Sequence, residues 1–332
     1  MPQSLSLSAA AGPKRPSEWL RALFRRNEIA LLLSLVALIV FFSLASDSFL
    51  TTRNITNVLG QASLAMVAGI GVGVLVISGE IDVSIGSLAG AVGIPLVVIM
   101  NMTGSLELGI AGALLLALCV GVVNGFLAAY IGINSLIVTL GSMFVIRGAV
   151  YLYTGQKAIP DDLMLESFYQ IGNGRLFGAI SYPALVAIVL LSAFIYLMRH
   201  RPFGRKLYAV GGNPEVARLA GYDVKRVKFI AFVICSLLAG ISGILLSSRL
   251  GSAVHVAGLG FEFQVVAAVV LGGVSLAGGI GSLFGVALGV LILSFLANGL
   301  GMLNIATEWQ LVTTGLIIIA AVAFDELKRR AK

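Results

Sequence analysis

The stretch Val58–Ser78 reads VLGQASLAMVAGIGVGVLVIS, which is 21 residues without a charged side chain. A helix needs about 20 apolar residues to cross the hydrocarbon core of a bilayer. Similar apolar runs recur along the chain from Ile29 to Phe324. The sequence therefore predicts an all-α polytopic membrane protein with about ten transmembrane helices.

Each predicted span is rich in apolar residues and poor in charge. The spans are Ile29–Ala45, Val58–Ser78, Val83–Met100, Leu108–Ile131, Ile133–Tyr153, Tyr182–Met198, Phe229–Ser247, Phe263–Gly279, Gly281–Leu300 and Trp309–Phe324. In the glycine-rich region 265–300 a broken or re-entrant segment is the alternative to a clean hairpin. Residues 154–181 form the longest outer connection, and Asp161–Gln170 has the spacing of a short amphipathic helix.

The overall composition excludes an ordinary soluble domain. The chain is 58% hydrophobic and 11% charged, and its mean hydropathy is +1.03. A net charge of +7 is compatible with nucleic-acid binding, but the basic residues lie beside the apolar runs and not among exposed aromatic residues. We therefore expect no nucleic-acid partner, and we interpret the charge as a signal of membrane topology. The 40 glycines favour closely packed helices.

Basic residues divide unequally between the two faces that ten spans define. Seventeen Lys and Arg residues lie in the N-terminal segment 1–28, the middle loop 199–228 and the C-terminal tail 325–332, whereas four lie on the other face. The excess of positive charge marks the cytoplasmic side. We therefore expect one transmembrane domain, residues 29–324, with both termini and the middle loop in the cytoplasm.

The middle loop contains the residues of a short capped helix. Asn213 suits the N-cap, Pro214 the first helical position, and Glu215 the positive end of the helix dipole. Gly221 supplies a C-terminal stop. The predicted helix, Pro214–Ala220, is too short to be stable alone. It is either part of a basic loop that fixes topology or a site that receives force from a soluble partner, and Arg218 is one of its exposed side chains.

Two carboxylates lie between the second and third predicted spans. Residues 78–87 read SGEIDVSIGS and include Glu80 and Asp82. Acidic groups at the border of membrane helices are costly to bury, so they are functional candidates. The alternative is that Asp82 caps a helix beginning at Val83, with Ser84 bonded to nearby backbone.

A glycine-rich stretch carries the third unusual pattern. Residues 271–289 read LGGVSLAGGIGSLFGVALG, with small residues at spacings of three and four. Such spacing permits close helix crossing. Unwound backbone beside a cavity is the alternative. The tetrapeptide IGSL occurs at 85–88 and again at 280–283, which hints at an internal repeat.

Polar side chains inside predicted spans are the further candidates for a transport pathway. Arg147 either lines the pathway or extends toward the outer interface, and the amides either contact solute or join helices. His200 and His255 lack neighbours suited to a metal site, so we expect none. The candidates are Gln61, Ser63, Asn124, Asn134, Ser135, Thr139, Ser142, Arg147, Gln264, Ser294 and Asn298, together with Glu80, Asp82 and Ser84.

The three patterned stretches together resemble the permease subunits of bacterial ATP-binding-cassette sugar importers of the ribose type. Residues 79–87 are similar to the family pattern Gly-Gly-Ile-Asp-Leu-Ser-Val-Gly-Ser, with Glu80 in place of the second glycine. Residues 211–222 are similar to Gly-Gly-Asn-x-x-Ala-Ala-Arg-x-x-Gly-Ile, with Val216 and Tyr222 at two positions. The positions that agree with the second pattern are Gly211, Gly212, Asn213, Ala217, Arg218 and Gly221.

The resemblance implies a permease of the vitamin-B12-importer-like (type II) architecture in the bacterial inner membrane. It implies a dimer with a second copy or a close paralogue, and import of a sugar or sugar-like solute by alternating access. Residues 213–221 would form the coupling helix that docks on a cytoplasmic ATPase, and a periplasmic binding protein would deliver the solute. The chain has no Gly-x-x-x-x-Gly-Lys-Ser/Thr phosphate loop, so ATP and Mg²⁺ are expected on the partner.

Three other classes of protein are alternatives. A permease for branched-chain amino acids has a similar architecture, but we expect different glycine motifs in it. A secondary transporter or channel needs no ATPase and more often carries an acidic residue in the middle of a span. An intramembrane enzyme requires paired catalytic groups such as H-E-x-x-H, which the chain lacks, so we expect no catalytic residue.

Overall fold

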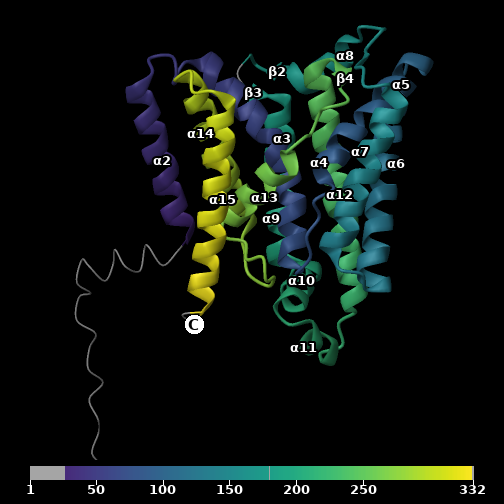
Figure 1. Cartoon of the computed structure of the whole chain (residues 1–332), viewed down its shortest axis with the longest axis vertical. Coiled ribbons are helices and arrows are strands. Elements are labelled where there is room, and N and C mark those ends of the chain that lie inside the picture. Colours follow the sequence, from purple (N-terminus) through teal and green to yellow (C-terminus); the bar gives the residue numbers. More distant parts are fainter. Residues whose placement is uncertain (1–26, 179, 331–332) are drawn as a thin grey trace, which may run out of the picture.

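The structure is a computed structural model that describes residues 27–178 and 180–330 (Figure 1). Helices dominate the described part of the chain. They are α2 (Asn27–Ala45), α3 (Thr52–Ile77), α4 (Ile85–Ala91), α5 (Gly93–Thr103), α6 (Leu106–Gly125), the π-helix η1 (Phe126–Ile131), α7 (Ser135–Thr154), α8 (Glu166–Asn173), α9 (Tyr182–His200), α10 (Pro202–Gly212), α11 (Pro214–Leu219), α12 (Val224–Leu250), α13 (Phe261–Leu271), α14 (Leu283–Met302) and α15 (Thr307–Arg330).

The chain is an all-α multi-pass membrane protein. Eight helical segments of the described residues are long and apolar enough to cross a bilayer, counting α4 with α5 and α6 with η1. The shorter α13 and the C-terminal α15 occupy the positions of the two other predicted spans. Many large apolar side chains of α2 and α9 are exposed, among them Phe41 and Ile188. Exposed apolar side chains on membrane-crossing helices match a hydrocarbon environment.

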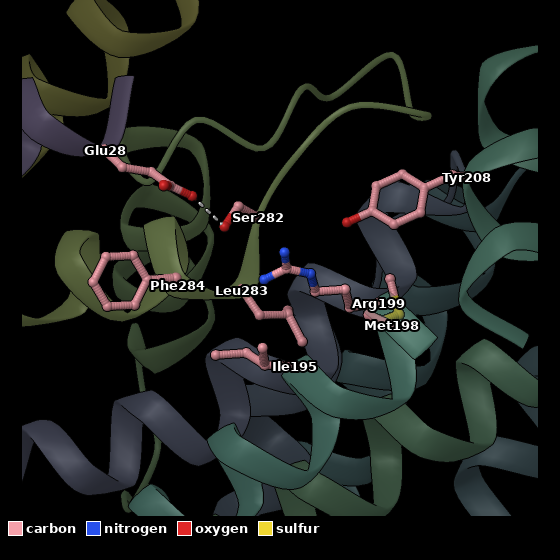
Figure 2. Close-up of a pocket in the computed structure, with 8 residues that line it drawn as sticks. All are labelled: Glu28, Ile195, Met198, Arg199, Tyr208, Ser282, Leu283 and Phe284. Atoms are coloured by element: carbon pink, nitrogen blue, oxygen red, sulfur yellow. Dashed lines mark hydrogen bonds between the residues drawn. The ribbon is translucent and has the colours of Figure 1, made fainter. Parts of the chain in front are cut away.

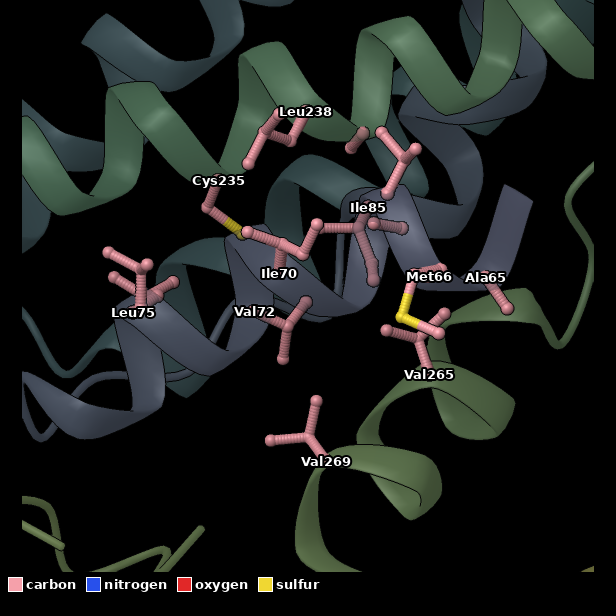
Figure 3. Close-up of a cluster of buried hydrophobic side chains, with 14 of the residues drawn as sticks. Ala65, Met66, Ile70, Val72, Leu75, Ile85, Cys235, Leu238, Val265 and Val269 are labelled. Carbon is pink, nitrogen blue, oxygen red and sulfur yellow. The ribbon is translucent and has the colours of Figure 1, made fainter. Parts of the chain in front are cut away.

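Helix α3 is the centre of the packing. In its apolar 18-residue stretch, 94% of the residues are buried. Helices α12, α14, α9 and α13 surround it. Figure 3 shows Ile70 and Val72 of α3 between Cys235 of α12 and Val269 of α13. A Cβ on Gly71 would lie 3.0 Å from the Cα of Cys235. The absence of that carbon lets the backbones of α3 and α12 approach, as glycine does in membrane helix pairs.

The prediction of one continuous span at Phe263–Gly279 is wrong. Helix α13 is only 11 residues long and ends at Leu271, and residues 272–282 are not helical. Gly273, Gly278 and Gly279 have φ angles of 85°, 85° and 71° in this segment. Only glycine adopts such angles without a steric penalty, so these residues unwind the backbone. The alternative of a broken segment is therefore correct.

The predicted span Val83–Met100 is also interrupted. Its helix begins at Ile85 and divides at Val92 into α4 and α5. Pro95 has no backbone N–H to donate to the carbonyl one turn earlier, and this accounts for the division between α4 and α5. The backbone within the bundle is therefore non-helical at two places, before α4 and around α13.

The two ends of the bundle are built differently (Figure 1). At one end β1 (Ile159–Pro160) pairs with β4 (Ser252–Ala253), and β2 (Arg175–Leu176) pairs with β3 (Ile180–Ser181), both antiparallel. Helix α8 lies at this end. Helices α10 and α11 lie at the other, where α2 begins and α15 ends. Both described ends of the chain are therefore on the side of α11.

Two sequence predictions about the connections need adjustment. The outer connection contains a helix, as expected, but α8 starts at Glu166 and not at Asp161. The Asp161 carboxylate accepts the backbone N–H groups of Leu163 and Leu165, at 3.1 and 2.9 Å, and so forms a turn before the helix. The expected N-terminal segment 1–28 falls largely outside the described residues. Helix α15 continues to Arg330, through most of the expected tail.

The close crossings give a test of the packing. A Cβ on Gly243 of α12 would overlap the carbonyl oxygen of Ala89 in α4, whereas a Cβ on Gly148 of α7 would meet nothing within 4 Å. We expect Gly243→Ala to destabilise the protein by about 1–3 kcal/mol through overpacking. Gly148→Ala is the matched control and should leave the thermal midpoint in detergent unchanged or raised. Equal midpoints for the two variants would contradict this account of the α4–α12 contact.

Candidate functional site

Helix α11 is capped as its sequence indicates. The Asn213 side-chain oxygen accepts the backbone N–H groups of Glu215 and Val216, at 3.0 and 3.1 Å. Pro214 occupies the first turn, and Gly221 has a φ of +83°. The helix ends at Leu219, one residue before the predicted end. The caps satisfy backbone groups that a free two-turn helix would leave to water.

Helix α11 presents a mixed surface to the solvent. Ala217 is 2% exposed and holds the helix against the protein, while Val216 and Leu219 are 59% and 89% exposed. Arg218 lies 3.6 Å from Glu215 across one turn, and both side chains are largely exposed. An exposed pair of this kind contributes little to stability. Apolar and charged groups together on a protruding helix are typical of a protein docking site.

Helix α10 is a part of this end that the sequence analysis missed. Pro202 lies in its first turn, and Phe203, Leu207 and Val210 follow at helical spacing. That proline and that spacing are the signals that predict a helix. Leu207 and Val210 are fully buried, so α10 is anchored in the bundle and carries α11 directly after it.

The end of α10 meets two other segments at four glycines, Gly79, Gly211, Gly278 and Gly279, which we name the glycine junction. A Cβ on Gly211 would overlap the carbonyl oxygen of Ile77 and lie 2.7 Å from the backbone nitrogen of Gly279. A Cβ on Gly278 would lie 2.8 Å from the Cα of Gly79. The three stretches that carried the sequence resemblance therefore touch backbone to backbone at one place.

An ion pair lies beside the glycine junction. Lys228 Nζ on the second turn of α12 is 2.6 Å from a carboxylate oxygen of Glu80, and the two side chains are 19% and 14% exposed. A pair this shielded from water is expensive to break, because removing one partner leaves the other charge without compensation. The pair ties the start of α12 to the segment between α3 and α4.

Asp82 does not cap a helix at Val83, so that interpretation is wrong. Its Oδ1 accepts the backbone N–H and the hydroxyl of Ser84, at 2.8 and 2.6 Å, and α4 starts later. Asn124 of α6 donates to the Ser84 hydroxyl at 3.1 Å and accepts a hydrogen bond from Ser142 of α7. These residues form a buried polar network between three segments. The second oxygen of Asp82 has no partner among the described residues.

Arg147 is 9% exposed, and its side chain reaches a connection at the end of the bundle that carries the short strands. Its Nη1 donates to the carbonyl oxygens of His255 and Ala257, at 3.1 and 2.9 Å. His255 lies in the connection between β4 and α13. Glu262, in the first turn of α13, is 6% exposed and lies within electrostatic range of Arg147. Glu262 was not among the candidates predicted from the sequence, although an acidic residue next to an apolar run is a signal for such a site.

The other candidates have separate local roles. Asn134 accepts the N–H of Leu136 at 3.0 Å and so caps α7. Asn298 of α14 exchanges two hydrogen bonds of 2.9 Å with Asn54 of α3. Thr139 donates to the carbonyl oxygen of Ser135 one turn earlier. Gln264 is partly buried on α13. Among the described residues, no hydrogen bond joins these four side chains to Asp82 or Arg147.

Comparison with known proteins identifies a family. Residues 54–322 match the family described as "Branched-chain amino acid transport system / permease component". The L-arabinose ABC transporter permease protein AraH of Azospirillum brasilense is 37% identical over 331 residues, 99% of this chain and 96% of that protein. The ribose import permease protein RbsC of Escherichia coli K12 is 35% identical over 300 residues, 90% and 93% of the two chains. The probable ABC transporter permease protein YphD of the same strain is 38% identical over 324 residues, 96% of each.

The two ion pairs of this end predict contrasting effects on stability. We expect Lys228→Met to lower the free energy of unfolding by about 3 kcal/mol, because Glu80 is left shielded and unpaired. Arg218→Met is the control and should cost about 0.5 kcal/mol or less, because its pair with Glu215 is exposed. Thermal midpoints in detergent measure the difference. The exchanged variant E80K/K228E should recover part of the loss, and equal midpoints for the two single variants would count against the ion pair.

Proposed function

The chain belongs to the family of branched-chain amino acid transport system permease components, and from that premise we propose that it is the transmembrane subunit of an ATP-driven sugar importer. The observation that carries this function is the match to the arabinose and ribose permeases over at least nine-tenths of both chains. A match of that extent includes all three stretches of the glycine junction. The chain is a permease, and its solute is a sugar or a closely related molecule.

A permease for branched-chain amino acids is the second candidate, since the family's own description names that transport system. The relatives with the most complete overlap argue against it, because those with a named solute transport arabinose or ribose. Both are polyhydroxylated solutes, which polar side chains bind by several hydrogen bonds. Uptake of labelled arabinose, ribose and leucine by vesicles containing the complete importer separates the two candidates.

The energy for transport comes from another subunit in this proposal. The sequence has no phosphate-binding loop of the Gly-x-x-x-x-Gly-Lys-Ser/Thr type, so ATP and Mg²⁺ belong to a separate ATPase. Helix α11 is the coupling helix that docks on it. Its caps and its exposed Val216 and Leu219 support that role. The chain itself performs no hydrolysis.

The orientation follows from charge. The end of the bundle with α10 and α11 carries the basic middle loop, so it faces the cytoplasm of a bacterium. The end with α8 and the four short strands then faces the periplasm, where a sugar-binding protein delivers the solute. A second permease subunit, identical or paralogous, completes the pathway in the inner membrane.

Transport then requires that movement of the ATPase reaches the membrane helices. Helix α11 follows α10 directly, and α10 contacts the end of α3 and the segment before α14 through the glycine junction. Close-packed backbones transmit displacement because they have little space to absorb it. Solute shifts the balance of outward and inward states only by its difference in affinity for them. The networks around Asp82 and Arg147 are the proposed polar contacts along that pathway.

The coupling helix is tested by removing it. Deletion of residues 214–220, or Arg218→Glu, should leave the protein in the membrane but reduce co-purification of the ATPase about tenfold or more, because a reversed charge opposes docking. Arg205→Glu on α10 is the control outside the coupling helix and should retain the ATPase. Undiminished co-purification and uptake in the deletion variant would remove α11 from this role.

The glycine junction is tested by two adjacent substitutions. A Cβ on Gly211 overlaps neighbouring backbone, whereas a Cβ on Gly212 meets nothing within 4 Å. We expect Gly211→Ala to reduce sugar uptake about tenfold while the ATPase still co-purifies, because overpacking displaces α10 from α3. Gly212→Ala should transport as the unchanged protein does. Normal uptake by both variants would show that the contact does not transmit movement.

A further inference from the structure

A cavity of about 480 Å³ opens between α2, α9, α10 and α14 at the end of the bundle that carries α11. It lies outside the glycine junction and the polar networks, and the proposed function does not use it. Figure 2 shows its lining. The residues are Glu28, Ile195, Met198, Arg199, Tyr208, Ser282, Leu283 and Phe284.

The cavity contains two opposite charges. The Ser282 hydroxyl donates to Glu28 Oε1 at 2.7 Å and so orients the carboxylate. The guanidinium of Arg199 projects between Ser282 and Leu283 (Figure 2) and makes no hydrogen bond or ion pair with any residue that the structure describes. An arginine fork is suited to a phosphate group. The cavity thus offers to one ligand an anion oriented by Ser282 and a cation that has no partner in the part of the chain that the structure describes.

The other residues that line the cavity are a tyrosine that forms hydrogen bonds and several apolar side chains. Tyr208 donates its hydroxyl to the carbonyl oxygen of Gly281 at 2.9 Å, which leaves the phenolic oxygen free to accept. Burial raises the pKa of Tyr208, so the phenol stays neutral at physiological pH. Ile195, Met198 and Phe284 supply an apolar wall. A ligand that fits all of these groups needs a charged head and an apolar body.

The position of the cavity favours a lipid. Its polar groups come from the first turn of α2 and the last turn of α9, where membrane helices meet the aqueous phase. Leu32 of α2 and Tyr196 of α9 are 47% and 52% exposed close by. A tyrosine at this depth is typical of the membrane interface. These positions place the cavity at the level of lipid headgroups, at the end of the bundle that carries α11.

We propose that the cavity binds one phospholipid with a zwitterionic, primary-amine headgroup, as in phosphatidylethanolamine. The phosphate pairs with Arg199, and the ammonium group pairs with Glu28 and the phenolic oxygen of Tyr208. An acyl chain lies along Ile195 and Phe284. A purely anionic headgroup satisfies Arg199 but brings a second negative charge to Glu28, so it fits less well.

The bound headgroup also restrains the segment that joins the glycine junction to α14. Ser282 caps α14 by accepting the N–H of Gly285 at 3.3 Å, and Gly279 of the glycine junction precedes it by three residues. A lipid fixed on Glu28 and Arg199 joins α2 and α9 across this segment. The inference does not depend on which solute the protein transports, and its test requires neither solute nor ATPase.

Native mass spectrometry of the full chain in detergent tests the assignment. The protein is titrated with palmitoyl-oleoyl phosphatidylethanolamine, phosphatidylglycerol and phosphatidylcholine. We expect phosphatidylethanolamine to bind about fivefold more tightly than phosphatidylcholine, whose methylated ammonium donates no hydrogen bond. Arg199→Gln should weaken both phosphatidylethanolamine and phosphatidylglycerol about fivefold. Glu28→Gln should weaken phosphatidylethanolamine about fivefold but leave phosphatidylglycerol unchanged or tighter.

A loss of phosphatidylethanolamine affinity in Glu28→Gln without a loss of phosphatidylglycerol affinity is the decisive result. Arg205→Gln, an exposed cation of α10 outside the cavity, is the matched control and should change no affinity. Thermal midpoints without added lipid check that the variants remain folded. Equal binding of phosphatidylethanolamine and phosphatidylcholine, an unaltered phosphatidylethanolamine affinity in Glu28→Gln, or the same loss in Arg205→Gln as in Arg199→Gln would each overturn the proposal.

Discussion

One backbone hydrogen bond lies at the point where three parts of the fold meet. The N–H of Gly279 donates to the carbonyl oxygen of Ile77 at 2.9 Å, at the end of α3. Inside a membrane protein an unpaired backbone group is costly, so a non-helical segment needs partners of this kind. Gly211 lies against the same carbonyl. A side chain at that position would separate α10 from both segments, so the arrangement requires a glycine there.

Because the fold depends on contacts between distant backbone groups, only some of its helices could be predicted from the sequence. The ends of α11 were predictable, because Asn213, Pro214 and Gly221 act through local hydrogen bonds and backbone angles. Most spans were predictable from composition for a similar reason, since the bilayer imposes length and apolarity. Helix α13 was not, because Gly273–Gly279 are compatible both with close helix crossing and with an unwound backbone. The choice between them depends on tertiary partners such as Ile77.

The hydrogen-bond partners of the candidate pathway residues could not be predicted from the sequence either. Asn124 and Asn298 are both amides inside apolar helices, and both join helices in the structure. Their sequence neighbours do not distinguish a network around a buried carboxylate from an isolated pair. Arg147 likewise depends on the carbonyl groups of a connection more than a hundred residues away. Such roles follow from where segments meet, and a single sequence gives that information only through a resemblance.

The contacts of α11 and the contacts of the glycine junction have different roles in the proposed function. Helix α11 touches the bundle chiefly through Ala217 and leaves Val216 and Leu219 exposed, so in the proposed function these two side chains serve docking and not stability. The glycine junction has no side chains to rearrange, so in the proposed mechanism a displacement of α10 passes to α3 and to the start of α14 without a change of rotamers. Lys228 and Glu80 extend the same rigid unit to α12. We therefore propose that an ATPase bound to this one short helix moves three membrane helices, α3, α12 and α14, together.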